Sequence, residues 1–307
     1  RRYRLLSLTK CIGKAIIKEN SKTEVFMITE KIDLYGYFGV KRKSGAAGYL
    51  NTYVPAVIDG MKPKLRPAML VIAGGGYAVV SQRESEVVAL KYSVNGFSAF
   101  TLDYSVNTAY PVPLLEACMA VIYIKENAVK YNVDVNHIAA IGFSAGGHLA
   151  AMLANIYGEK EIADVLGGKV ALAKLDAVLL AYPVITMQSL SVGGSRNVIT
   201  GGNPDLMERL SIEKRVTKNS APAFVWHVYE DDRVSVENSL LLAQAYRQAG
   251  VPFELHIFEK GWHGVSVCSD ETENDHAIVE RLSAVAKWFD MSLDWLKLRG
   301  FCVKTVM

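Results

Sequence analysis

The residues that most clearly suggest catalytic chemistry lie at 142–146, which read Gly-Phe-Ser-Ala-Gly. A short apolar run ends at this Gly-x-Ser-x-Gly pattern, and an Ala- and Leu-rich helical segment follows it at once. In this setting the pattern is typical of a nucleophilic serine on a sharp turn between a strand and a helix. Small neighbours let the backbone and the helix approach closely, and the N–H groups at the helix start favour negative charge. Ser144 is therefore the candidate nucleophile.

A serine hydroxyl is a weak nucleophile, so it needs a base, a carboxylate that orients the base, and donors for the oxyanion. His263 is the candidate base because it lies in a glycine-flanked loop between the last predicted strand and the last predicted helix. His148 comes one helical turn after Ser144, and we expect it to be a buried packing residue. The other histidines fit the role less well by position, since they precede most acidic candidates or fall inside a predicted strand: His137, His227 and His256.

Three adjacent carboxylates follow the strand predicted over 223–228 and precede His263. They are Glu230, Asp231 and Asp232, and their spacing alone does not distinguish them. Because one carboxylate suffices to orient the histidine, we expect the other two to face solvent or to pair with Arg233.

The segment Ala73–Tyr77 reads Ala-Gly-Gly-Gly-Tyr and directly follows a predicted strand. Glycines let backbone N–H groups approach a substrate without obstruction, so the N–H groups of Gly75, Gly76 and Ala145 are the candidate oxyanion donors. A phosphate-binding loop is disfavoured because no Gly-Lys-Ser/Thr follows. Three aromatic residues are candidates for the substrate pocket, with ordinary core packing as the alternative for each: Tyr77, Tyr182 and Trp262.

From about residue 46 onward, near-continuous apolar runs alternate with helical segments. This alternation predicts an α/β protein with a mostly parallel central sheet of about eight strands and helices on both faces. Strands are expected at 49–54, 68–72, 98–102, 138–143, 177–182, 223–228 and 254–258, and helices at 84–94, 113–131, 145–157, 237–249 and 277–298. We expect residues 1–30 to form an N-terminal extension and 31–307 a single catalytic domain, with a rim insertion at about 186–220.

Composition excludes several other classes. The chain has 307 residues, of which 50% are hydrophobic and 21% charged, and its net charge of +3 is too small to indicate nucleic-acid binding. No apolar run approaches the roughly 20 residues of a membrane span, and no secretory leader is recognisable, which predicts a cytoplasmic protein without membrane contact.

The acidic stretch before His276 is expected to be a solvated loop. The cysteines are too far apart for a zinc site or a disulfide framework: Cys11, Cys118, Cys268 and Cys302.

Together these segments resemble the α/β-hydrolases of the prolyl-oligopeptidase-related carbohydrate esterase group, which includes acetyl-xylan-esterase-like and feruloyl-esterase-like proteins. The resemblance implies the α/β-hydrolase fold and assigns the acid to Asp231, because the family pattern places the acid three residues before a valine, here Val234. Arg83 and Glu84 match a family Arg-Glu pair, interpreted as an ion pair at a helix start. Ser235 and Ala73 depart from family prolines without removing a catalytic group. The matching segments are 73–77, 81–84, 141–150, 181–185, 226–234 and 253–264.

The resemblance implies a serine carboxylic-ester hydrolase that removes short acyl groups, acetyl first among them, from a carbohydrate through an acyl-enzyme. Such chemistry needs no metal or organic cofactor, and the expected partner is a small-molecule or oligosaccharide ester, with the oligomeric state left open. The enzymatic alternatives are a general small-molecule carboxylesterase and a related serine peptidase. A catalytically silent binding protein on the same scaffold is the non-enzymatic alternative.

Overall fold

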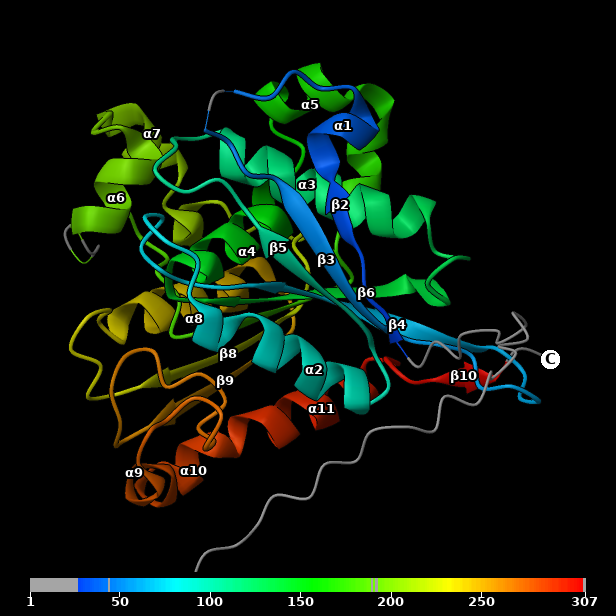
Figure 1. Ribbon diagram of the computed structural model, residues 1–307. Helices are drawn as coiled ribbons and strands as arrows, with labels where there is room; N and C mark the ends of the chain where they lie inside the picture. Colours follow the sequence, from blue (N-terminus) through cyan, green and yellow to red (C-terminus); the bar gives the residue numbers. More distant parts are fainter. Residues whose placement is uncertain (1–26, 44, 189, 191–192, 306–307) are drawn as a thin grey trace, which may run out of the picture.

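The computed structural model describes residues 27–43, 45–188, 190 and 193–305. In this part of the chain a sheet of ten strands forms the centre of the molecule (Figure 1). Eight strands follow one another in the order β1-β3-β5-β4-β6-β7-β8-β9, and the short strands β2 and β10 pair with β3 and β4. Pairing is parallel from β5 through β4 to β9 and antiparallel elsewhere. The prediction of a mostly parallel sheet is confirmed.

All seven strands predicted from apolar runs are present, with small differences at their ends. The strands are β1 (Met27–Ile28), β2 (Lys31–Asp33), β3 (Tyr49–Pro55), β4 (Lys64–Ile72), β5 (Ser98–Asp103), β6 (Val133–Phe143), β7 (Ala177–Ala181), β8 (Ala223–Val228), β9 (Phe253–Phe258) and β10 (Lys304–Thr305).

Helices cover both faces of the sheet and explain why the buried part of a central strand such as β4 is apolar at successive positions. Along β4, Leu70 and Ile72 pack in one buried cluster, whereas Met69 and Val71 pack in the other. Because side chains alternate across a strand, a sheet covered on both faces requires apolar residues at successive positions. Helices α3 (Val112–Glu126), α4 (Ser144–Ile156) and α8 (Glu237–Ala249) contribute to the first cluster, and α2 (Glu86–Val94) and α11 (Trp288–Leu298) to the second (Figure 1).

Two predicted helices differ from the observed ones. The helix expected over 113–131 ends at Glu126, where the Asn127 side chain donates to the Tyr123 carbonyl and the chain turns toward the sheet. The helix expected over 277–298 is divided into α9 (His276–Arg281), α10 (Ser283–Ala286) and α11. The chain bends at Leu282, whose side chain is buried in the second cluster, so burial there overrides a continuous helix.

The region predicted as a rim insertion lies between β7 and β8 and contains α6 (Gly193–Thr200), α7 (Pro204–Arg209) and a 3-10 helix, η3 (Ile212–Lys214). Arg209 bonds to Glu159 and Glu161 at 2.8 Å, and Arg215 bonds to Glu159 at 2.6 Å. These pairs attach the insertion to α5 (Lys160–Leu166) and to the residue that precedes it. The remaining short helices are α1 (Leu34–Phe38) and the 3-10 helices η1 (Gln82–Glu84) and η2 (Gly167–Ala173).

The predicted N-terminal extension lies largely outside the described residues, although Met27 and Ile28 near its end pair with β3. Within the described part of the chain, no helix combines the length and the apolar character needed to cross a membrane.

The sheet order places a natural ligand site beside β4. This strand has β5 as one parallel neighbour and β6 as the other: the chain leaves β4 for β5 on one side, and the next connection, from β5, crosses to β6 on the other side of β4. Open α/β sheets bind ligands at such a switch point, outside the carboxyl ends of the strands. The loops after β4, β6, β8 and β9 are therefore expected to carry the functional residues.

Candidate active site

Ser144 lies at the junction of β6 and α4 in a strained conformation. Its φ of 52° is in the left-handed region, which costs an L-residue roughly 1–2 kcal/mol. A Cβ on Gly142 would lie 2.2 Å from the Gly146 carbonyl oxygen, and a Cβ on Gly146 would lie 2.3 Å from the Ala73 carbonyl oxygen. The glycines of the Gly-x-Ser-x-Gly pattern are thus required by packing, and they hold the serine at the sheet edge.

The structure brings Ser144, Asp231 and His263 together. His263 Nε2 lies 2.8 Å from Ser144 Oγ, and His263 Nδ1 lies 2.7 Å from Asp231 Oδ2. The residues come from the loops after β6, β8 and β9, whose carboxyl ends share one edge of the parallel sheet. A nucleophile, a base and an orienting carboxylate at these distances have the geometry for proton transfer from the hydroxyl to the imidazole.

Among the three adjacent carboxylates, the geometry selects Asp231. Its side chain is fully buried, and Oδ1 accepts hydrogen bonds from the N–H groups of Arg233 at 2.9 Å and Val234 at 2.8 Å. Glu230 instead pairs with Lys260, and the Asp232 side chain is 70% exposed. Burial acts to raise the pKa of Asp231, but the histidine and backbone hydrogen bonds outweigh it and hold that pKa well below 3.8. The carboxylate is therefore ionised and is placed to accept a hydrogen bond from His263 Nδ1.

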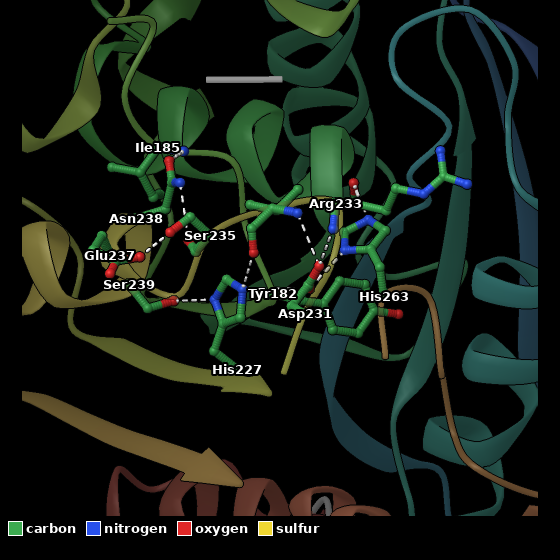
Figure 2. A network of polar contacts seen from close by, with 12 residues as sticks. Tyr182, Ile185, His227, Asp231, Arg233, Ser235, Glu237, Asn238, Ser239 and His263 are labelled. Atoms are coloured by element: carbon green, nitrogen blue, oxygen red, sulfur yellow. Dashed lines mark hydrogen bonds and ion pairs between the residues drawn. The ribbon is translucent and has the colours of Figure 1, made fainter. Parts of the chain in front are cut away.

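His227 lies beside Asp231, a contact that no sequence pattern predicted (Figure 2). Its ring is fully buried, with Nδ1 2.7 Å from Ser239 Oγ and Nε2 2.9 Å from the Val234 carbonyl oxygen. Nε2 also lies 3.4 Å from Asp231 Oδ2. The available signal was the position of His227 near the end of β8, four residues before the acid.

The loop after β4 runs close to Ser144. A Cβ on Gly74 would lie 3.0 Å from Ser144 Cβ, and Gly75 and Gly76 have φ values of 122° and 66°, which favour glycine. Within the described residues, no hydrogen bond uses the N–H of Gly75 or Gly76. Ala145 is in the first turn of α4, where N–H groups have no partner inside the helix. Three backbone donors thus remain available beside the serine.

A cleft of about 670 Å³ opens above these groups. Trp262 lines it, as do Ser195 of α6, Arg83 and Arg233. The full lining comprises Gly75, Gly76, Val79, Ser81, Arg83, Glu84, Ser144, Ser195, Asp232, Arg233, Val234, Trp262, His263 and Gly264.

Tyr77 and Tyr182 do not line the cleft, which corrects their assignment to the pocket. Both side chains are fully buried. The Tyr77 hydroxyl lies 2.8 Å from His148 Nδ1, and the Tyr182 hydroxyl donates to Glu84 at 2.7 Å. His148 is itself fully buried under the loop, as expected from its place on the helix. These tyrosines therefore support the loops from beneath.

The expected ion pair between Arg83 and Glu84 is also wrong. Arg83 pairs with Glu273. Glu84 is instead buried, accepting from the Gly74 N–H at 2.9 Å and from the Tyr182 hydroxyl at 2.7 Å. Burial raises the pKa of Glu84. Neighbouring positions in η1 point in different directions, which separates the two side chains.

Comparison with known proteins agrees with this architecture. Residues 50–246 match the BD-FAE family. The chain is 37% identical over 218 residues to endo-1,4-beta-xylanase B of Butyrivibrio fibrisolvens, covering 67% of this chain but 33% of that protein. It is 25% identical to an acetylxylan esterase of Xylanibacter ruminicola, covering 64% of this chain and 40% of the relative. The chain thus spans about a third of the xylanase and two fifths of the esterase.

Two solved structures are similar over nearly their whole length. An acetyl ester-xyloside bifunctional hydrolase from Caldicellulosiruptor lactoaceticus has a TM-score of 0.68 and 34% identity, covering 82% of this chain and 88% of that one. The carboxylesterase Cest-2923 from Lactobacillus plantarum has a TM-score of 0.74 and 25% identity, covering 90% and 98%. With its sheet order and its match over residues 50–246, the chain belongs to the BD-FAE family and has the α/β-hydrolase fold of carbohydrate esterases.

Proposed function

We propose that this protein is a serine carboxylic-ester hydrolase that removes short acyl groups, acetyl first among them, from a carbohydrate. The observation that carries the proposal is the continuous contact from Ser144 Oγ through His263 to Asp231, at 2.8 and 2.7 Å. The names of the xylanase, the acetylxylan esterase and the acetyl ester-xyloside hydrolase support the carbohydrate assignment.

In the acylation half-reaction, Ser144 Oγ attacks the ester carbonyl carbon while His263 Nε2 takes the hydroxyl proton. Asp231 fixes the ring and stabilises the imidazolium. The carbonyl oxygen becomes an oxyanion that accepts hydrogen bonds from the N–H groups of Gly75 or Gly76 and of Ala145. The intermediate collapses when the C–O bond to the alcohol breaks, and His263 returns its proton to the leaving alcohol.

In the deacylation half-reaction, a water molecule replaces the alcohol. His263 takes one proton from this water as its oxygen attacks the acyl carbon, and the same donors hold the second oxyanion. Cleavage of the bond to Ser144 Oγ, with return of the proton from His263, releases the carboxylic acid and restores the enzyme.

The lining of the cleft supports a short acyl group and a polar alcohol. Of the residues that line the cleft in the described part of the chain, Val79, Val234 and Trp262 are the large apolar ones. Few large apolar side chains are therefore available to contact a long alkyl chain, in which each buried CH₂ would contribute about 0.8 kcal/mol. Ser81, Ser195 and Asp232 offer hydrogen-bonding groups to sugar hydroxyls, and the Trp262 ring offers a flat face.

The test is release of p-nitrophenol from its acetate, butyrate and octanoate esters by the wild type and by Ser144→Ala. We expect the acetate to be the best substrate and the variant to lose activity. Hydrolysis of acetylated xylooligosaccharides, compared with peptide amides, then separates a carbohydrate esterase from a peptidase. Absence of both ester hydrolysis and labelling by a fluorophosphonate in the wild type would contradict the proposal and favour a binding protein.

A general small-molecule carboxylesterase is the second candidate, supported by the similarity to Cest-2923 over nearly the whole of both chains. Equal rates on acetylated oligosaccharides and on unrelated acetate esters would favour it.

A further inference from the structure

We propose that Glu84 is a positioning residue that holds the Gly74 peptide so that the next two N–H groups face Ser144. This inference rests on the proposed function, since those N–H groups are the assigned oxyanion donors. Glu84 belongs to neither the proton relay nor the donor set, yet its carboxyl group lies between them.

The first hydrogen bond of the Glu84 carboxyl group is with the loop that carries the proposed oxyanion donors. Glu84 Oε2 accepts the Gly74 N–H at 2.9 Å, and a Cβ on Gly74 would lie 2.7 Å from the same oxygen. The loop backbone is thus in close contact with the carboxyl group. The same Cβ would also lie 2.8 Å from the Phe143 carbonyl oxygen and 3.0 Å from Ser144 Cβ. Gly74, the Glu84 carboxyl group and the turn at Ser144 therefore meet in a space that leaves no room for a side chain at position 74.

The second hydrogen bond connects Glu84, through Tyr182, to the loop that carries His263. Glu84 Oε1 accepts from the Tyr182 hydroxyl at 2.7 Å, and that hydroxyl accepts from the Ser266 N–H at 3.1 Å. The Tyr182 ring meets the His263 ring edge-on, with 5.0 Å between centroids (Figure 2 shows the two rings side by side). Ser266 follows His263 by three residues, so a single carboxyl group links the donor loop to the base loop.

Burial explains why this link is rigid. Glu84 is 4% exposed and Tyr182 is fully buried, so little water is available to replace their hydrogen bonds. Removing the carboxyl group would leave the Gly74 N–H and the Tyr182 hydroxyl without acceptors, which is unfavourable for buried donors. The loop would relax to recover those hydrogen bonds, and displacement of the donors by about 1 Å lowers a rate about 100-fold.

The experiment uses three substitutions of Glu84 that differ in side-chain length and in the hydrogen-bond acceptors that they keep. Glu84→Ala removes both contacts. Glu84→Asp keeps the carboxyl group but is one methylene too short to serve both donors. Glu84→Gln keeps the length and an oxygen for Gly74. We expect kcat on p-nitrophenyl acetate to fall about 100-fold in the Ala variant with little change in KM, to fall less in the Asp variant, and to stay within about tenfold in the Gln variant.

A transition-state analogue distinguishes positioning from a general loss of packing. A boronic acid that adds to Ser144 places an oxygen in the oxyanion site, so its inhibition constant should rise by the same factor as kcat/KM falls. Glu116 supplies the matched control. It is a buried carboxyl that accepts from the Tyr35 hydroxyl at 2.8 Å and the Ser105 N–H at 2.6 Å, and it does not line the cleft. Glu116→Gln and Glu116→Ala should lower stability while kcat and boronic-acid affinity remain within about twofold.

Full activity in Glu84→Asp or Glu84→Ala would overturn the inference, as would an equal loss in the Glu116 variants. If Glu84→Ala does not fold, the kcat and boronic-acid affinity of Glu84→Asp provide the test. Failure of the proposed function is a separate result, in which the wild type is no more active than Ser144→Ala. In that case a crystal structure of Glu84→Asp decides, because Gly75 and Gly76 in their wild-type positions would refute a positioning role.

Discussion

Replacing Asp231 by asparagine tests the proposed relay most sharply, because the surroundings dictate how the amide must lie. In the wild type, Oδ1 accepts two backbone N–H groups and Oδ2 accepts His263 Nδ1–H. The amide oxygen of the substituted side chain should take the Oδ1 position, since the reverse orientation leaves both backbone donors without an acceptor at about 1–3 kcal/mol each. The amide NH₂ then faces His263 Nδ1.

That arrangement favours the wrong tautomer of the base. His263 Nδ1 must accept a hydrogen bond from the amide, so the ring proton moves to Nε2, which faces Ser144 Oγ at 2.8 Å. A protonated Nε2 cannot take the hydroxyl proton. We expect kcat to fall about 10,000-fold, equivalent to about 5 kcal/mol in the activation free energy, with little change in the fold.

The assay is the initial rate of p-nitrophenyl acetate hydrolysis, with urea unfolding to establish that the variant is folded. Glu230→Gln is the matched control, because it neutralises an adjacent carboxylate that pairs with exposed Lys260, and it should stay within about twofold of wild type. Retention of more than about 1% of the activity by Asp231→Asn would refute the tautomer argument. An equally large loss in Asp232→Asn would refute the choice of Asp231.

Two further predictions concern stability. Gly146→Ala should lower the free energy of unfolding by at least about 2 kcal/mol, since the new Cβ would lie 2.3 Å from the Ile72 and Ala73 carbonyl oxygens, whereas Gly158→Ala, with open space around it, should not. Urea denaturation measures both, and equal effects would contradict the packing requirement. Burial lowers the pKa of His148 from 6.5 to about 4, so the unfolded chain binds more protons in that window and stability is lost as the pH falls through it. The wild type should therefore lose about 3 kcal/mol more than His148→Gln between these pH values, and parallel curves would exclude His148 as the cause.

The layered fold and the candidate nucleophile, Ser144, could be predicted from the amino-acid sequence alone. Near-continuous apolar runs predict strands covered on both faces, and such strands alternate with helices only in a few architectures. The Gly-x-Ser-x-Gly segment is local, because its glycines, strand end and helix start are all neighbours in the chain. His263 could also be predicted as the candidate base, since its glycine-flanked loop follows the last strand. Each of these features is formed by residues that are only a few positions apart in the chain, so a local sequence pattern can predict it.

The tertiary structure decided the contacts between distant loops. Three adjacent carboxylates look alike in a sequence, and Asp231 is distinguished because its side chain turns inward to meet His263 while Asp232 faces solvent. Tyr182 looked like a pocket residue because it ends a strand, but its ring turns into the core. Glu84 bonds to Gly74 and to Tyr182, which is 98 residues away, and no local pattern encodes that pairing. Side-chain direction at a strand end depends on what packs against it, and that is a property of the assembled layers.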